Sequence, residues 1–155
     1  MSITAENKLS ATLLAIRLAL GIVVLGHGTQ KLLGWFGGYG FDGTMGYFTQ
    51  TIGIPYFLGV LIILVESVGM IGLILGLCGR TISASLIFIM AGAIFFDHWQ
   101  YGFFMDWGNN LQGEGYEFHL LVISLALAIV INGTGAYSID RLLRSWLGRK
   151  RRVLA

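Results

Sequence analysis

The sequence has little charge, a single cysteine and a single proline. Charged residues make up 12% of its 155 residues, about half the fraction found in an ordinary soluble domain. So little charge cannot cover the surface of a soluble domain of this size, and it excludes a disordered chain and a basic nucleic-acid-binding protein. Since Cys78 is the only thiol, an intrachain disulfide, a CxxC redox pair and a cysteine-ligated iron–sulfur cluster are also excluded.

Long apolar runs take the place of charge. Hydrophobic residues make up 55% of the chain. About 20 apolar residues at 1.5 Å rise cross ~30 Å of hydrocarbon, and backbone in lipid must satisfy its own hydrogen bonds, so such runs predict transmembrane helices. Four are predicted, at about residues 9–33, 55–77, 81–99 and 114–131. The sequence therefore predicts an all-α integral membrane protein, a four-transmembrane-helix bundle formed by one domain over 1–155.

The lysines and arginines predict how this bundle is oriented. The loops 34–54 and 100–113 contain none, whereas most of them lie near the two ends of the chain and in the turn 78–80. Basic residues favour the cytoplasmic side of a membrane. We therefore expect both termini to be cytoplasmic and both long loops to face the other side.

Residues 138–148 predict a further helix that lies on the membrane. Ser138 is a suitable N-cap residue. The apolar residues that follow share one helical face: Ile139, Leu142, Leu143, Trp146 and Leu147. We expect an amphipathic interfacial helix on the inner leaflet, with the basic run 149–152 against anionic lipid and not nucleic acid.

Two ionisable residues in the predicted spans mark a first candidate site. A charge near the bilayer centre costs ~2.5–3.5 kcal/mol, so such groups usually face protein or water. Arg17 and Glu66 lie at predicted depths about one helical turn apart. We expect an ion pair between them, either as a structural link between the first two helices or with Glu66 as a proton carrier.

A larger polar group is predicted near the long loops. Its members lie within roughly two turns of that boundary: His27, Gln30, Lys31, Asp97, His98, Glu114, Glu117 and His119. We expect a polar pocket roofed by the two aromatic loops; the alternative is a bundle end where lysine and carboxylates neutralise each other. A metal or haem site on the three histidines is a further alternative, but no HExxH, HxH or CxxCH motif supports it, and we predict no metal.

Several short motifs between about residues 13 and 140 are specific in combination. They are Arg17-Leu-Ala-Leu-Gly21, His27-Gly28-Thr-Gln-Lys31, Pro55, Val65-Glu66 followed by Gly69 and Gly76, and Gly133-Thr-Gly-Ala-Tyr137-Ser138-Ile-Asp140. Together they resemble the DoxX family of small bacterial membrane proteins. The resemblance implies a four-helix protein of the bacterial inner membrane and an oxidoreductase role, because relatives include membrane subunits of quinone-linked oxidoreductases. Other relatives act as membrane chaperones or cargo receptors without redox chemistry.

The resemblance and the polar residues together nominate a site. With one cysteine and no cofactor motif, the chain has no evident electron carrier, so we expect a quinone, with haem as the open alternative. His27 and Lys31 would donate hydrogen bonds to it, and Glu66 or Glu117 would relay protons. The candidate catalytic residues are His27, Lys31 and Glu66. The candidate ligand-binding residues are Arg17, Gln30, His98, Glu117 and His119.

Three functions remain open on the sequence alone. The first is a membrane component of a quinone-linked oxidoreductase system that works in lipid with a redox partner protein. The second is a non-enzymatic scaffold that binds lipid or assembles a partner. The third is a small transporter, which would require a homo-oligomer because four helices are few for a monomeric one.

Overall fold

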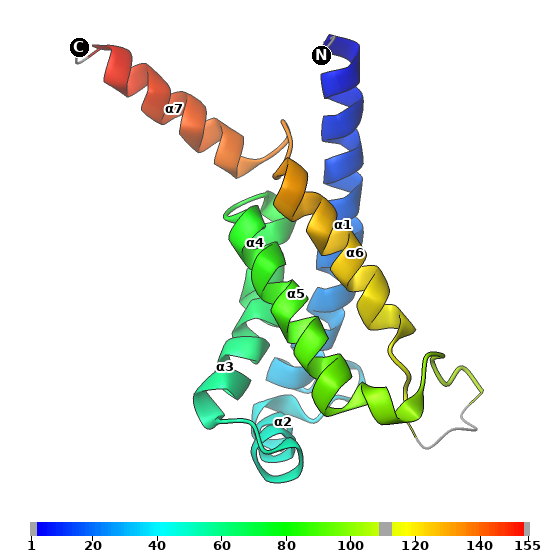
Figure 1. Ribbon diagram of the computed structural model, residues 1–155. Coiled ribbons are helices and arrows are strands. Elements are labelled where there is room, and N and C mark those ends of the chain that lie inside the picture. Colours follow the sequence, from blue (N-terminus) through cyan, green and yellow to red (C-terminus); the bar gives the residue numbers. More distant parts are fainter. Residues whose placement is uncertain (1–2, 109–112, 154–155) are drawn as a thin grey trace.

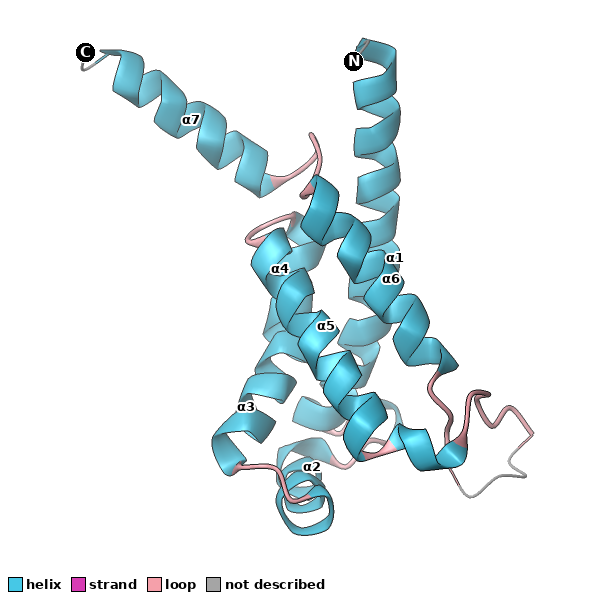
Figure 2. Cartoon of the chain, viewed as in Figure 1, coloured by secondary structure: helices cyan, strands magenta, loops and turns pink. Residues whose placement is uncertain are grey.

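The computed structural model describes residues 3–108 and 113–153, and every regular element in them is a helix. In chain order the elements are α1 (Ile3–Leu33), η1 (Trp35–Gly37), α2 (Gly40–Gly46), η2 (Tyr47–Ile52), α3 (Tyr56–Leu64), η3 (Val65–Gly69), α4 (Met70–Leu75), α5 (Gly79–Phe96), η4 (His98–Tyr101), α6 (Glu117–Asn132) and α7 (Ile139–Val153). Both termini lie at one end of the bundle (Figure 1). The long loops lie at the opposite end (Figure 2). We call these two ends the termini end and the loop end.

Three helical stretches are long and apolar enough to cross a membrane. They are Thr4–Leu33, Tyr56–Leu75 and Gly79–Phe96. The second of these joins α3, η3 and α4 into one rod, in which η3 is a π-helical turn. The predicted fourth span corresponds to α6, which is apolar but has only 16 residues. The predicted all-α membrane class is confirmed, and the fourth span stays a prediction.

The core of the bundle lies between α1, α4, α5 and α6. Its buried apolar side chains are Leu20, Val24, Met70, Leu73, Leu86, Met90, Val122, Ala126 and Ile129. Toward the loop end the packing changes, because η3 and α4 contact α5 whereas α3 contacts α1, α2 and η2. Figure 1 shows α3 diverging from α5 as it approaches the loop end. The bundle is therefore closed near the termini and opens toward the loops.

Glycine sets the register between α1 and the second rod. A Cβ on Gly28 would lie 2.0 Å from the carbonyl oxygen of Glu66, so the two backbones meet there and only glycine fits. Gly28 lies eleven positions after Arg17 on α1, a distance of ~16 Å along a helix. The expected Arg17–Glu66 ion pair is wrong, because matching the two helices by predicted depth placed Glu66 too close to the termini end.

Arg17 contacts the chain after α6 instead. Its guanidinium is fully buried, and Nη2 donates a hydrogen bond to the carbonyl oxygen of Tyr137 at 2.6 Å. Asp140 is the carboxylate whose charge acts on this guanidinium. Gly76 makes room for it, since a Cβ there would lie 1.9 Å from Nη1 and its φ of +71° also favours glycine.

Asp140 and Ser138 complete this group of residues. Asp140 accepts hydrogen bonds from the backbone N–H of Cys78 at 2.9 Å and of Gly79 at 3.3 Å. The Ser138 hydroxyl accepts one from the N–H of Arg141 at 3.3 Å, so the predicted cap of the last helix is confirmed. We call Arg17, Gly76, Tyr137, Ser138 and Asp140 the termini-end cluster; it joins α1, the turn before α5 and the start of α7.

The last helix is longer than the predicted 138–148 and runs away from the bundle (Figure 1). Four of its apolar side chains are exposed: Leu142, Leu143, Trp146 and Leu147. The side chains of the basic run 149–152 lie outside the described part of the chain. Whether this helix rests on a membrane stays a prediction.

Candidate functional site

The loop end holds a cavity of about 870 Å³, which we call the loop-end cavity. One wall is apolar and is built by the chain before α3, by α3 itself, by α5 and by α6. Its main side chains are Phe48, Ile52, Ile54, Leu58, Leu61, Phe88, Ile89, Ala93, Phe96 and Phe118. The volume lies in the range of small-molecule and cofactor sites.

The other end of this cavity is polar. Its ionisable and amide side chains are His27, Gln30, Lys31, Glu66, Asp97, His98, Glu114 and His119. They come from α1, from η3, from the junction of α5 and η4, and from the segment that leads from Glu114 into α6. Six of the eight residues nominated from the sequence are thus brought together, including all three candidate catalytic residues.

A lysine–glutamate pair lies at the centre of the polar end. Lys31 Nζ donates a hydrogen bond to Glu66 Oε2. Side chains on a helix lean toward its N-terminus, so Lys31 reaches back along α1 to the level of Gly28, where Glu66 lies. The Glu66 side chain is 3% exposed and that of Lys31 is 29% exposed. The carboxylate is therefore held by the protein while the ammonium faces the cavity.

Glu66 belongs to the π-helical turn η3. Such turns are rare and are frequent at functional sites. The next residue, Ser67, donates its hydroxyl to the carbonyl oxygen of Ile63, one turn earlier in α3, at 2.5 Å. The π-helical turn thus directs the Glu66 carboxylate toward Lys31, while the backbone of the turn stays in contact with Gly28.

The three histidines contribute rings and hydrogen-bonding nitrogens. The His98 and His119 ring centroids are 4.1 Å apart, and His27 packs on Phe118 at 5.4 Å. His98 Nδ1 lies 2.8 Å from the carbonyl oxygen of Glu114. In the described ranges, no group of three or more His, Cys, Asp and Glu side chains is arranged to hold a metal ion. The polar end is suited to hydrogen bonding and proton transfer.

Tyr47 and Asp97 lie beside the polar end and join two separate segments. The Tyr47 hydroxyl donates to Asp97 Oδ2 at 2.9 Å, which links η2 to the end of α5. Burial and this hydrogen bond raise the pKa of Tyr47 to about 12. Asp97 belongs to the expected polar group but was not nominated as a site residue. Tyr47 was missed, because nothing in an aromatic loop whose one charged residue is Asp42 marks one tyrosine as a cavity residue.

The family model for DoxX matches residues 12–99, more than half of the chain. The chain belongs to the DoxX family. The DoxX match covers most of α1, the second rod and α5, and so contains the Lys31–Glu66 pair. His119 and the termini-end residue Asp140 lie beyond it. No curated protein and no solved structure matches the chain.

Two nominated residues of this DoxX chain do not line the cavity. Arg17 lies in the termini-end cluster. Glu117 Oε1 accepts a hydrogen bond from the backbone N–H of Met105 at 2.9 Å, and its own N–H donates to the carbonyl oxygen of Phe103 at 2.9 Å. Glu117 therefore fixes the loop before α6 onto the bundle, whereas Glu114, three residues earlier, lines the cavity together with Glu66 and Asp97.

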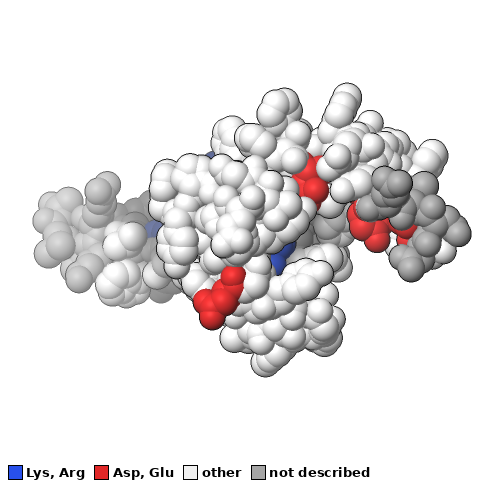
Figure 3. All heavy atoms as spheres, turned by 90° about the horizontal axis from the view of Figure 1, so that it is seen from below, with Lys and Arg blue, Asp and Glu red and all other residues white. Residues whose placement is uncertain are grey.

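The surface of the DoxX chain at the loop end carries little charge. Figure 3 views this end and shows mostly uncharged side chains, with carboxylates among them and few basic atoms. The exposed side chains near the cavity include Tyr39, Phe88 and Phe96, which are 85%, 79% and 58% exposed. Such a surface suits contact with lipid or with an apolar molecule.

Proposed function

We propose that the chain is a membrane component of a quinone-linked oxidoreductase system and that the loop-end cavity binds the quinone. The observation that supports this most strongly is the union of an apolar wall and a polar end in one cavity of about 870 Å³. A lipid-soluble quinone also has a polar and an apolar part: its ring carries two carbonyl oxygens, and its tail is apolar.

The residues at the polar end fit a neutral, carbonyl-bearing head. Of the described residues that line the cavity, three carry carboxylates, Glu66, Asp97 and Glu114, and one is a lysine, Lys31. An anionic headgroup would meet like charge there, which costs binding energy. A quinone ring carries no charge and needs hydrogen-bond donors, and Lys31 Nζ and the histidine rings are such donors.

The roles of the individual residues follow from their positions. Lys31 and His27 would hold the carbonyl oxygens, and Gln30, His98 and His119 would orient the ring. A bound quinone accepts two electrons and two protons. Glu66 is buried against Lys31 and would take up and deliver the two protons one after the other at its carboxylate oxygen. A redox partner protein would supply the electrons, because the one thiol, Cys78, is exposed and belongs to the turn before α5 at the termini end.

We propose that the apolar tail enters from the bilayer between α3 and α5. Leu61 and Phe88 line the cavity and are 53% and 79% exposed, so the cavity is open on that side. In this arrangement α6 is the fourth span of an inner-membrane protein. The side with the basic residues, including both termini, would face the cytoplasm, and the loop end would face away from it.

Quinone extraction tests the proposal. The full chain is purified in mild detergent, extracted with an organic solvent, and the extract is analysed for quinone by chromatography and absorption. We expect close to one quinone per chain. His27→Ala should lose it without loss of helical content, whereas Gly26→Ala should keep it, because no atom lies within 4 Å of a Cβ at Gly26.

Other results would favour another function. A folded chain that carries no quinone and takes none up on titration would contradict the proposal. Recovery of a phospholipid from the cavity, with no effect of His27→Ala on quinone reduction in membrane vesicles, would support the non-enzymatic scaffold. Solute flux in proteoliposomes that Glu66→Gln alters would support the small transporter.

A further inference from the structure

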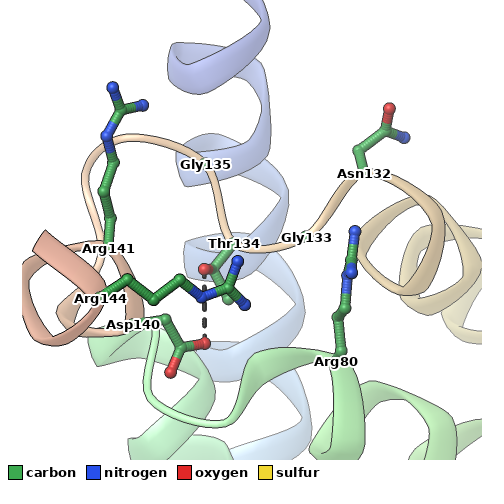
Figure 4. A pocket seen from close by; sticks show the side chains of 8 residues that line it. All are labelled: Arg80, Asn132, Gly133, Thr134, Gly135, Asp140, Arg141 and Arg144. Carbon is green, nitrogen blue, oxygen red and sulfur yellow. Dashed lines mark hydrogen bonds between the residues drawn. The ribbon is translucent and has the colours of Figure 1, made fainter. Parts of the chain in front are cut away.

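A second, smaller cavity lies at the termini end. It has a volume of about 210 Å³ and lies where α5 begins, α6 ends and α7 begins. Arginines from two helices surround it: Arg80 from α5, and Arg141 and Arg144 from α7. Figure 4 shows Arg80 and Arg141 on either side of the 133–135 turn, with the Arg144 side chain extending between them.

This cavity has an excess of positive charge. Among the described residues that line it, the one carboxylate is Asp140. Its oxygens already accept hydrogen bonds from two backbone N–H groups and the Thr134 hydroxyl. Asp140 also lies close enough for its charge to act on Arg17. The positive charge of three arginines is therefore opposed by one carboxylate, whose oxygens already accept hydrogen bonds from other groups.

The arginines retain free hydrogen-bond donors. Arg80 uses Nη2 to bind the carbonyl oxygen of Ile131 at 3.1 Å, which holds its side chain beside the cavity. Arg141 pairs with Glu6 at 3.3 Å, and both side chains are more than half exposed. Within the described ranges, Arg144 forms no ion pair or hydrogen bond through its guanidinium. Most of the guanidinium N–H groups around the cavity thus remain available.

We propose that this cavity binds the phosphate of an anionic phospholipid headgroup. Guanidinium groups bind phosphate oxygens through paired, charge-assisted hydrogen bonds. The helix α7, which supplies Arg141 and Arg144, favours a lipid as the source of the phosphate, because it also carries exposed apolar side chains. Leu142 is 68% exposed and Trp146 is 58% exposed, and the acyl chains of a bound lipid would cover them. The binding site would fix α7 against the membrane surface.

This site differs from general attraction between a basic segment and an acidic membrane. Each basic residue of a polybasic segment contributes a similar free energy of membrane binding, wherever in the segment it lies. A contribution of 1.4 kcal/mol corresponds to a tenfold change in affinity. A built cavity depends on particular residues. Arg144→Gln should therefore weaken binding far more than a change further along the same helix, although both remove positive charge.

The test uses the full chain in detergent and in nanodiscs. Binding of phosphatidylglycerol is measured by native mass spectrometry and compared with phosphatidylcholine. The variants are Arg144→Gln, which removes no described contact, and the double variant Arg141→Gln/Arg144→Gln. The matched control is Arg149→Gln/Lys150→Gln, which removes two charges from the same chain segment. Circular dichroism and gel filtration confirm that each variant folds.

We expect phosphatidylglycerol to bind the wild-type chain at least tenfold more tightly than phosphatidylcholine. The double variant should lose at least tenfold more of that affinity than the control, although each removes two charges, and Arg144→Gln should fall between the two. Equal losses in the double variant and the control would overturn the proposal in favour of general charge attraction. Displacement of the lipid by millimolar inorganic phosphate would overturn the choice of a lipid as the source.

The outcome is independent of quinone binding. The proposed quinone site lies at the loop end and the arginine cavity at the termini end, and no residue lines both. A chain that binds phosphatidylglycerol but no quinone would refute only the redox proposal, and the reverse result would refute only the lipid site.

Discussion

Each end of the bundle places a cation near a carboxylate, but only the cation and carboxylate at the loop end face a large cavity. At the termini end, Arg17 is fully buried and Asp140 is held by backbone N–H groups. At the loop end, Glu66 is buried while Lys31 is partly exposed to a cavity of about 870 Å³. The same chemistry thus locks helices together at one end and offers binding groups to a ligand at the other.

The charges that line the two cavities differ in sign. Carboxylates outnumber lysine at the loop end, whereas arginines outnumber the carboxylate at the termini end. An uncharged ring is suited to the first and a phosphate to the second. If this comparison is right, substitutions at the termini end should mainly affect stability or lipid binding, and substitutions at the loop end should mainly affect quinone binding.

The largest effect is expected at Arg17. Arg17→Met removes a fully buried guanidinium together with its hydrogen bond to the Tyr137 carbonyl oxygen and its charge near Asp140. We expect this to cost about 3 kcal/mol in the free energy of unfolding. Denaturant titration followed by circular dichroism measures the loss. Lys8→Met is the control, because Lys8 is an exposed cation on the same helix. If both variants lose the same free energy of unfolding, the termini-end cluster does not hold α1 against the start of α7.

The next effect is expected at Gly28. Gly28→Ala forces a methyl group onto the Glu66 carbonyl oxygen, so α1 and η3 must separate, at a cost of about 1–3 kcal/mol. Gly26→Ala is the matched control, since its Cβ meets no atom within 4 Å. Thermal unfolding should separate the two variants. Equal stability would show that the helices do not meet at Gly28.

A smaller effect is expected at the Lys31–Glu66 pair. In a double-mutant cycle, Lys31→Met and Glu66→Gln should be coupled by about 0.5–3 kcal/mol in the free energy of unfolding. The loss in Lys31→Met should be below that in Arg17→Met, because the Lys31 side chain is 29% exposed. Strictly additive effects on stability would indicate that the two side chains do not interact.

The smallest effect is expected at Tyr47. Its pKa is raised to about 12 by burial and the hydrogen bond to Asp97, so the neutral phenol is favoured in the folded state. The resulting stabilisation is fully present below the usual tyrosine pKa of about 10 and is lost as the pH rises through about 12. Absorbance at high pH should show one late-titrating tyrosine. Asp97→Asn should bring that titration to lower pH; an unchanged curve would contradict the contact.

The general fold could be predicted because lipid imposes simple rules on apolar runs. The first three spans and the helix after Ser138 follow from length, apolar content and a capping residue. The register between paired helices could not be predicted from the sequence. The register of α1 depends on the backbone contact at Gly28, and the π-helical turn η3 has no sequence signature, so Arg17 was assigned to the wrong carboxylate.

The polar end of the site was predictable and the apolar wall was not. His27, His98 and His119 could be grouped because polar residues at one depth avoid lipid. The wall depends on α3 diverging from α5, and apolar residues that face a cavity look the same in sequence as those that face lipid. Glu117 shows the limit of depth arguments, because it lies at the expected level but binds the neighbouring loop.

Direct titration of a short-chain quinone into the purified chain tests the central claim most directly. The change in intrinsic tryptophan fluorescence reports binding, with Lys31→Met as the site variant and Gly26→Ala as the control. We predict saturable binding of one quinone per chain, at least tenfold weaker in Lys31→Met and unchanged in Gly26→Ala. Absence of saturable binding to the wild-type chain, or equal affinity in Lys31→Met, would contradict a quinone site at the Lys31–Glu66 pair.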